Sequence, residues 1–128
     1  MNYTLIIPFY NEGQHVRPLN EEIINNIKKA DDGKRKFEII YVDDGSLDNT
    51  FNELKKLSTN SIETSIIRHR TNLSQSTALN TGIIQAKYEN LIILDGDLQN
   101  DPNDIIKMIN KFEEGTDMVI GWRKNRKD

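Results

Sequence analysis

Short apolar runs rich in β-branched residues recur along the chain and predict strands. Their apolar character is continuous rather than alternating, which is typical of strands buried on both faces of a parallel sheet. The predicted strands are YTLIIPF (3–9), FEIIYVD (37–43), ETSIIRH (63–69), NLIILDG (90–96) and DMVIGW (117–122).

Segments with the length and periodicity of helices lie between these runs. They cover Gly13 to Ala30, Asp48 to Leu57, Ser74 to Lys87, and Pro102 to Phe112. Ser46 or Asp48 is expected to cap the second helix and Ser74 the third, and Asp101 precedes a proline at the first helical position. The alternation of strand and helix predicts an α/β domain, with a mainly parallel sheet and helices on both faces.

Three polar clusters follow predicted strands directly. They are Pro8 to Glu12, Asp43 to Ser46, and Asp95 to Gln99. Each cluster alone reads as ordinary turn and cap residues. Because ligands of open parallel sheets bind beyond the carboxyl ends of the strands, we expect the clusters to meet at one edge. Acidic side chains gathered there would repel one another unless a cation or ligand compensated them.

The third cluster has the oxygen donors of a metal site. Asp95 and Asp97 project to the same side of an extended backbone, Gly96 permits close approach of a ligand, and Gln99 adds an amide oxygen. Such a set suits Mg²⁺ or Mn²⁺ with a diphosphate completing the shell. A calcium loop is excluded, since it requires a glycine and a glutamate where the chain has Asn100 and Ile106. Beyond the fifth strand, Arg123 is the cation best placed to hold phosphate oxygens.

Composition narrows the class of protein further. A chain of 128 residues is one domain by length, and without cysteine it has no thiol nucleophile, disulfide or thiolate metal site. No apolar run approaches the length of a membrane span, so a cytoplasmic protein is expected. The net charge of -3 argues against nucleic-acid binding, although the last eight residues, GWRKNRKD, are basic. Neither His15 nor His69 has metal-ligand spacing, so both are expected to have surface or structural roles.

Five ordered motifs carry a family resemblance that covers nearly the whole chain: LIIPFYNE, YVDDGSLDNT, TALNTGIIQA, ILDGDLQNDP and GWRKNRKD. In this order and spacing they resemble the family 2 glycosyltransferases of the GT-A fold, a Rossmann-like nucleotide-diphospho-sugar transferase fold. DGDLQNDP with GWRKNRKD is most similar to the polyprenyl-phosphate hexose transferases, the dolichol-phosphate mannosyltransferase-like group. The resemblance implies inverting transfer of a hexose from a UDP- or GDP-sugar to polyprenyl phosphate or a glycan.

The resemblance also implies roles for particular residues. The nucleoside-binding positions are Pro8, Tyr10, Glu12, Val42 and Asp44. The donor and metal motif is Asp95, Gly96, Asp97 and Gln99, with Asp97 and Gln99 as direct ligands of Mg²⁺ or Mn²⁺. Asp95, Asp97 and Arg123 are the expected catalytic residues, and Arg123 also approaches the donor's phosphates. Ser74 stands where a glycine is common in the family, and Tyr88-Glu89 where Gly-Asp is usual.

Relatives in this family continue beyond the position of Asp128 with an acceptor-binding region. Residues 1–128 are therefore expected to be a single nucleotide-sugar-binding domain, the donor half of a longer enzyme. Work at the cytoplasmic face of the membrane, peripheral membrane association and self-association are further expectations. The alternative is a regulatory or nucleotide-binding module without transferase activity, such as a receiver-like domain. A receiver would share the Asp43-Asp44 pair but carry a lysine after its last strand in place of Trp122-Arg123.

Overall fold

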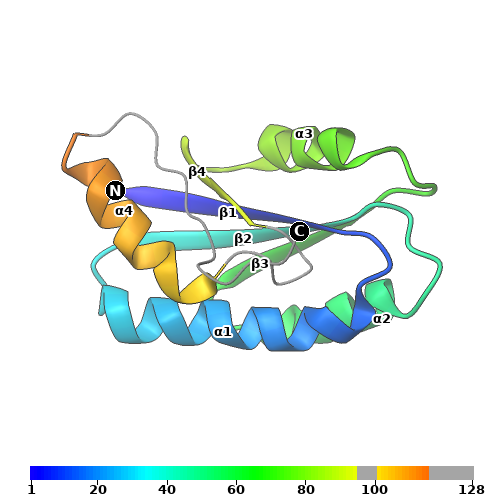
Figure 1. Ribbon diagram of the computed structural model, residues 1–128, viewed down its shortest axis with the longest axis horizontal. Helices are drawn as coiled ribbons and strands as arrows, with labels where there is room; N and C mark the ends of the chain where they lie inside the picture. The colour runs from blue at the N-terminus through cyan, green and yellow to red at the C-terminus, as the bar shows by residue number, and fades with distance from the viewer. Residues whose placement is uncertain (95–100, 116–128) are drawn as a thin grey trace.

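In the part of the chain that the structure describes, four parallel strands form the central sheet (Figure 1). The computed structural model describes residues 1–94 and 101–115. The strand order is β3-β2-β1-β4, with β1 at Asn2–Phe9, β2 at Lys36–Asp43, β3 at Glu63–Arg68 and β4 at Asn90–Ile93. Every pairing is parallel. These strands confirm the α/β class, while the predicted strand at 117–122 lies outside the described residues.

Helices cover both faces of the sheet, as the alternating pattern predicted (Figure 1). On one face lie α1, α2 and α4, and on the other lies α3. Their bounds are Gly13–Asp31 for α1, Thr50–Lys55 for α2, Gln75–Gln85 for α3 and Ile105–Glu113 for α4. Short 3₁₀ turns, η1 at Lys56–Thr59 and η2 at Pro102–Asp104, follow α2 and precede α4.

The core divides between the two faces of the sheet with the period of two that strands impose. Leu5 and Ile7 of β1 pack with α1 and α4, whereas Ile40 and Val42 of β2 pack on the other side against Ala78 of α3. Except for the first residue of each, β1 and β2 are buried throughout, which confirms the reading of their continuous apolar runs.

Burial on both faces was wrong for β3 and β4. Both strands alternate between exposed and half-buried positions, and Leu91 and Ile93 of β4 are 38% and 46% exposed. The reason is the position of α3, which packs over the central strands β1 and β2. Strands at the sides of a sheet then keep one face open within the described residues.

Two of the predicted helix starts need correction. The N-cap position of α2 is Asn49, whose side chain makes no cap hydrogen bond, so the predicted position is off by one residue; the predicted Asp48 still accepts a hydrogen bond from Thr50 N, at the first residue of α2, at 2.9 Å. The last helix begins with the 3₁₀ turn at Pro102 and becomes α-helical only from Ile105. Ser74 does cap α3, since its hydroxyl accepts a hydrogen bond from Thr77 N at 3.1 Å.

Candidate active site at the carboxyl edge of the sheet

The loops after β1 and β2 are tied together beyond the carboxyl ends of these strands. Asn11 N donates to Ser46 Oγ at 2.9 Å, and Leu47 N donates to Asn11 Oδ1 at 2.8 Å. Asn11 has a φ of 51°, a conformation that asparagine tolerates better than most residues. Glu12 N donates to Thr50 Oγ1 at 3.1 Å. Two of the three predicted polar clusters therefore meet at one edge, as expected.

Asp48 joins the same two loops from the start of α2. Its carboxylate accepts hydrogen bonds from Gly13 N at 3.2 Å, from Thr50 N at 2.9 Å and from the Thr50 hydroxyl. Partial burial acts to raise the pKa of Asp48, but these hydrogen bonds outweigh it and lower the pKa below its ordinary value. The loop after β1 is thus anchored by an ionised side chain.

Among the described residues of this edge, the Asp44 side chain accepts the most hydrogen bonds. It is 2% exposed. Oδ1 accepts from His69 Nδ1 at 2.8 Å and Leu73 N at 3.0 Å, and Oδ2 accepts from Asn72 Nδ2 at 2.9 Å and Ser74 N at 3.1 Å. A carboxylate offers about four lone-pair sites. All of them are used by the loop after β3, so a nucleoside N–H could bind Asp44 only by displacing one of these donors.

Sequence reasoning missed Asn72 altogether and expected only a surface or structural role for His69. The His69 side chain is 10% exposed and lies between two elements. Its Nδ1 contacts Asp44, and its Nε2 lies 2.9 Å from Thr81 Oγ1 in α3. Nothing in the sequence distinguishes His69 from His15. The contact between His69 and Asp44 therefore becomes visible only in the fold.

Gly45 lets the loops after β2 and β3 approach closely. A Cβ at this position would lie 2.2 Å from the carbonyl carbon of Thr71 and 2.4 Å from Asn72 N. Gly45 also has a φ of +74°, which side chains rarely adopt. The DDGS motif therefore requires its glycine for two independent reasons.

The other predicted nucleoside-binding residues lie at or beside this edge. Pro8 and Val42 are buried partners in the β1–β2 register. Tyr10 is 44% exposed, and Glu12 Oε2 lies 2.7 Å from His15 Nδ1. The neighbouring Asp43 is fully buried.

Asp43 divides its carboxylate between two environments. Oδ1 accepts from Ser46 N at 3.0 Å, whereas Oδ2 is buried without a hydrogen bond and lies 3.9 Å from Arg68 Nε. The Arg68 guanidinium in turn packs over the Phe51 ring, 4.3 Å from its centroid. The partly exposed guanidinium of Arg68, at the end of β3, therefore lies close to the buried carboxylate of Asp43.

The predicted donor and metal residues lie outside the described part of the chain. These are Asp95, Gly96, Asp97, Gln99 and Arg123. Leu94, directly before them, continues β4 by donating its N–H to Ile6 O at 3.1 Å. Within residues 1–94 and 101–115, no group of three or more His, Cys, Asp and Glu side chains is arranged to hold a metal ion.

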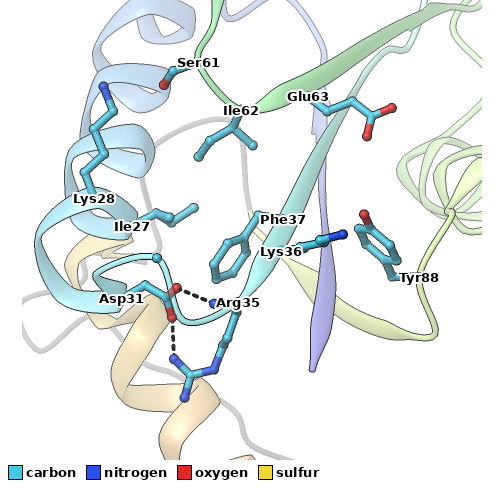
Figure 2. Close-up of a pocket in the computed structure, with 11 residues that line it drawn as sticks. Ile27, Lys28, Asp31, Arg35, Lys36, Phe37, Ser61, Ile62, Glu63 and Tyr88 are labelled. Atoms are coloured by element: carbon cyan, nitrogen blue, oxygen red, sulfur yellow. Dashed lines mark hydrogen bonds and ion pairs between the residues drawn. The ribbon is translucent and has the colours of Figure 1, made fainter.

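A hollow of about 420 Å³ lies at the other end of the sheet (Figure 2). The first residues of β2 and β3, Lys36 and Glu63, line it together with Ile27 and the ion pair of Asp31 and Arg35. Among the described residues, none of those predicted for ligand binding lines it. Since ligands of such sheets bind beyond the carboxyl ends of the strands, we place the candidate site at the opposite edge.

The chain belongs to glycosyl transferase family 2, whose model matches residues 4–128. It is 37% identical over 130 residues to a dodecaprenyl-phosphate galacturonate synthase of Rhizobium johnstonii, covering 100% of this chain and 38% of that protein. It is also 37% identical over 129 residues to an undecaprenyl-phosphate 4-deoxy-4-formamido-L-arabinose transferase of Proteus mirabilis, covering 98% and 38%. The predicted family is confirmed.

Solved structures confirm the GT-A fold. S. aureus TarS matches with a TM-score of 0.71 at 23% identity, over 89% of this chain and 32% of that one. The mannosyltransferase PcManGT from Pyrobaculum calidifontis, solved with GDP-Man and Mn²⁺, matches with a TM-score of 0.68 at 23% identity, over 81% and 30%. A divalent metal therefore accompanies the nucleotide sugar in one neighbour of the same fold.

The chain spans 38% of the length of each of these two curated relatives. Among the helices in the described part of the chain, none combines the length and apolar character that crossing a bilayer requires.

Proposed function

We propose that this chain is the nucleotide-sugar-binding domain of an inverting glycosyltransferase that moves a hexose from a UDP- or GDP-sugar to polyprenyl phosphate. The observation that carries the proposal is the family match over residues 4–128, joined to relatives whose names specify transfer onto dodecaprenyl and undecaprenyl phosphate. Peripheral association with the membrane that holds such an acceptor, and self-association, belong to the same proposal.

The nucleoside is proposed to bind at the edge formed by the loops after β1 and β2. Tyr10 offers an exposed aromatic ring and Glu12 a partly exposed carboxylate, both on a loop held in place by hydrogen bonds to the next loop. Pro8, Val42 and Asp44 are buried at or just beyond the ends of β1 and β2, where this loop begins. A few polar groups beside buried apolar residues are the usual composition of a small-molecule site.

The metal is proposed to bind Asp97 and Gln99, with Asp95 and Gly96 in the same motif. The donors fit Mg²⁺ or Mn²⁺, because both ions prefer carboxylate and amide oxygens and leave positions for phosphate. In the described part of the chain, the Asp44 carboxylate is filled by other donors, which supports the segment after β4 as the metal-binding motif. A bound divalent cation would offset the negative charge that develops on the leaving diphosphate.

In the proposed transfer, an oxygen of the polyprenyl phosphate forms a bond to the anomeric carbon from the face opposite the leaving group. The bond between that carbon and the diphosphate oxygen breaks, and its electron pair leaves with the nucleoside diphosphate. Arg123 is proposed to stabilise that charge through its planar guanidinium. Because a phosphate monoester with a second pKa of about 6 is already ionised near neutral pH, the acceptor needs no base.

Nucleotide binding tests the donor site. We expect UDP or GDP to bind with an affinity that rises when Mn²⁺ is added, measured by titration calorimetry. Asp97→Asn should abolish the Mn²⁺-dependent part of the affinity and leave the melting temperature unchanged. Asp104→Asn, the same substitution beside α4, is the control and should leave both the Mn²⁺-dependent affinity and the melting temperature unchanged. Equal affinities for wild type and Asp97→Asn at saturating Mn²⁺ would overturn the metal assignment. No response to either nucleotide would favour a receiver-like module.

A transfer assay tests the proposal that residues 1–128 bind the donor while a further region of the enzyme binds the acceptor. Labelled nucleotide sugars and a short-chain polyprenyl phosphate are incubated with this chain and with a version extended to the length of its relatives. We expect product from the extended version and turnover lower by orders of magnitude from residues 1–128, since positioning two reactants can contribute about 7 to 11 kcal/mol to lowering a barrier. Comparable turnover by both would show that the 128 residues contain a complete acceptor site.

A further inference from the structure

The loop after β3 borders the proposed nucleoside site without being held there by apolar burial. Every residue from 71 to 77 is exposed. Two backbone N–H groups of this loop, those of Leu73 and Ser74, donate to the buried carboxylate of Asp44. The Asn72 side chain donates to the same group. Hydrogen bonds to Asp44 are therefore the main interactions that hold the loop against the Gly45 backbone.

Ser74 shows that these contacts hold the loop against strain. Its backbone has φ 154° and ψ 161°, a region that is almost restricted to glycine and costs other residues about 1 to 3 kcal/mol. Its N–H is bound by Asp44, and its hydroxyl caps α3 through Thr77 N. Such a conformation persists only where the surroundings determine it firmly.

His69 connects this carboxylate to α3 through both ring nitrogens. Its Nδ1 lies 2.8 Å from Asp44 Oδ1, and its Nε2 lies 2.9 Å from the Thr81 hydroxyl. The Thr81 hydroxyl is also 3.0 Å from Thr77 O, one turn earlier in α3. Because a carboxylate oxygen accepts hydrogen bonds, Nδ1 is the donor towards Asp44.

The far end of this connection is rigid. A Cβ on Gly82, the residue after Thr81, would lie 2.5 Å from Ile6 Cγ2 in β1. That turn of α3 therefore lies directly on the central strand and has no room to move inward. His69 therefore fixes the position of Asp44 relative to the core of the sheet. Through Asp44 it also fixes the position of the loop.

We propose that His69 is a positioning residue of the donor site: it holds Asp44 between β2 and α3, and thereby fixes the 71–74 loop beside the nucleoside. The inference rests on the proposed function for what the loop does, but not for how the loop is held. Two measurements separate these parts.

The first measurement is hydrogen exchange of the backbone amides in a matched pair of variants. His69→Asn keeps an N–H donor close to the position of Nδ1, whereas His69→Phe keeps the ring shape and loses both ring nitrogens. We expect the Leu73 and Ser74 amides to exchange about tenfold faster in His69→Phe and near the wild-type rate in His69→Asn, with core amides such as Ile39 unchanged. If the ring only fills space, the order reverses and Asn is the more damaging substitution. Either that reversal or a uniform increase over all amides would overturn the proposal.

The second measurement is nucleotide affinity of the same variants, with Thr81→Val to remove only the Nε2 partner. We expect His69→Phe to weaken UDP or GDP binding about tenfold or more, His69→Asn to stay within about threefold, and Thr81→Val to fall between them. Nitrogen NMR of the imidazole should show a proton on Nδ1 in the wild type. A ring without that proton would overturn the hydrogen bond from His69 to Asp44. Absence of nucleotide binding by the wild type would refute the donor site alone, since the exchange data still decide how the loop is held.

Discussion

The two ends of the parallel sheet are held by different kinds of interaction. At the carboxyl end, side chains such as Asp44 and Asp48 accept hydrogen bonds from backbone N–H groups of loops. At the amino end, one guanidinium joins side chains from several elements. Arg35 donates to both Glu113 oxygens, at 2.8 and 3.0 Å, and pairs with Asp31. Tyr3 adds a hydrogen bond to Glu113 at 2.5 Å.

The two networks have different structural effects: the one at the carboxyl end fixes loops, and the one at the amino end joins secondary-structure elements. The amino-end network ties α1, β1, β2 and α4 together through side chains, and no residue proposed for donor binding belongs to it. The carboxyl-end network fixes backbones that stay exposed to a ligand. Substitutions at the amino end should therefore lower stability alone, whereas those at the carboxyl end should also change nucleotide binding.

Two glycines with almost the same φ test this comparison with the largest expected effect. Gly45 has φ +74° and a Cβ clash with Thr71, while Gly33, between α1 and β2, has φ +75° and nothing within 4 Å of a Cβ. Gly45→Ala should lower the free energy of unfolding by about 3 kcal/mol and weaken nucleotide binding. Gly33→Ala should cost about 1 kcal/mol and leave binding unchanged. Urea unfolding measures both, and equal losses would refute the close approach of the two loops.

Glu113 gives a smaller effect with a defined pH dependence. Hydrogen bonds from Arg35 and then from Tyr3 lower the pKa of Glu113 from 4.5 to about 2. A carboxyl whose pKa is lower in the folded state stabilises the fold above its ordinary pKa, and this contribution is lost as the pH falls from about 4.5 towards 2. Glu113→Gln should cost about 1 to 2 kcal/mol at pH 7, with little difference from wild type near pH 2.

Denaturant unfolding across this pH range measures the loss, with Glu114→Gln as the adjacent control. A Glu113→Gln variant whose stability deficit did not shrink in acid would contradict the ion pair. Weakened nucleotide binding in this variant would contradict the separation between the two ends of the sheet.

Ser74→Gly gives the smallest expected effect, and its sign is the informative part. Relief of the backbone strain should outweigh the loss of the cap, because glycine is only a few tenths of a kcal/mol worse than serine at an N-cap. We expect a gain of about 1 kcal/mol in the free energy of unfolding. Ser76→Gly, inside α3, should instead lose about 0.5 kcal/mol. If both substitutions destabilise the protein, Ser74 is not strained.

The strands and helices could be predicted because each carries its own local signal. Runs of isoleucine, leucine and valine mark β1 and β2, and Ser74 marks the start of α3 in the sequence as it does in the structure. The open faces of β3 and β4 could not be predicted this way. Their apolar runs resemble those of the central strands, and only the placement of α3 over β1 and β2 makes them different.

The meeting of the first two polar clusters at one edge could be predicted from the sequence, but the contacts made there could not. Asp44 stands out as an acid after a buried strand, but its partners at residues 69 to 74 come from the next crossover. Which loop folds back on a carboxylate depends on how two βα units pack, and that is a tertiary property. The family's usual glycine at position 74 was a usable signal, since the serine here keeps a glycine-like backbone.

The register of the sheet has a consequence for the order of events during synthesis. β1 is made first and gains β2 on one side as soon as Lys36–Asp43 is made. Its other side stays open until Asn90–Ile93 has followed, because Tyr3 pairs with Asn90. For that interval a nascent chain presents the unpaired backbone of a buried, largely apolar strand, an edge on which other chains can add strands. Completion of β4 is therefore the step that removes this aggregation hazard from β1.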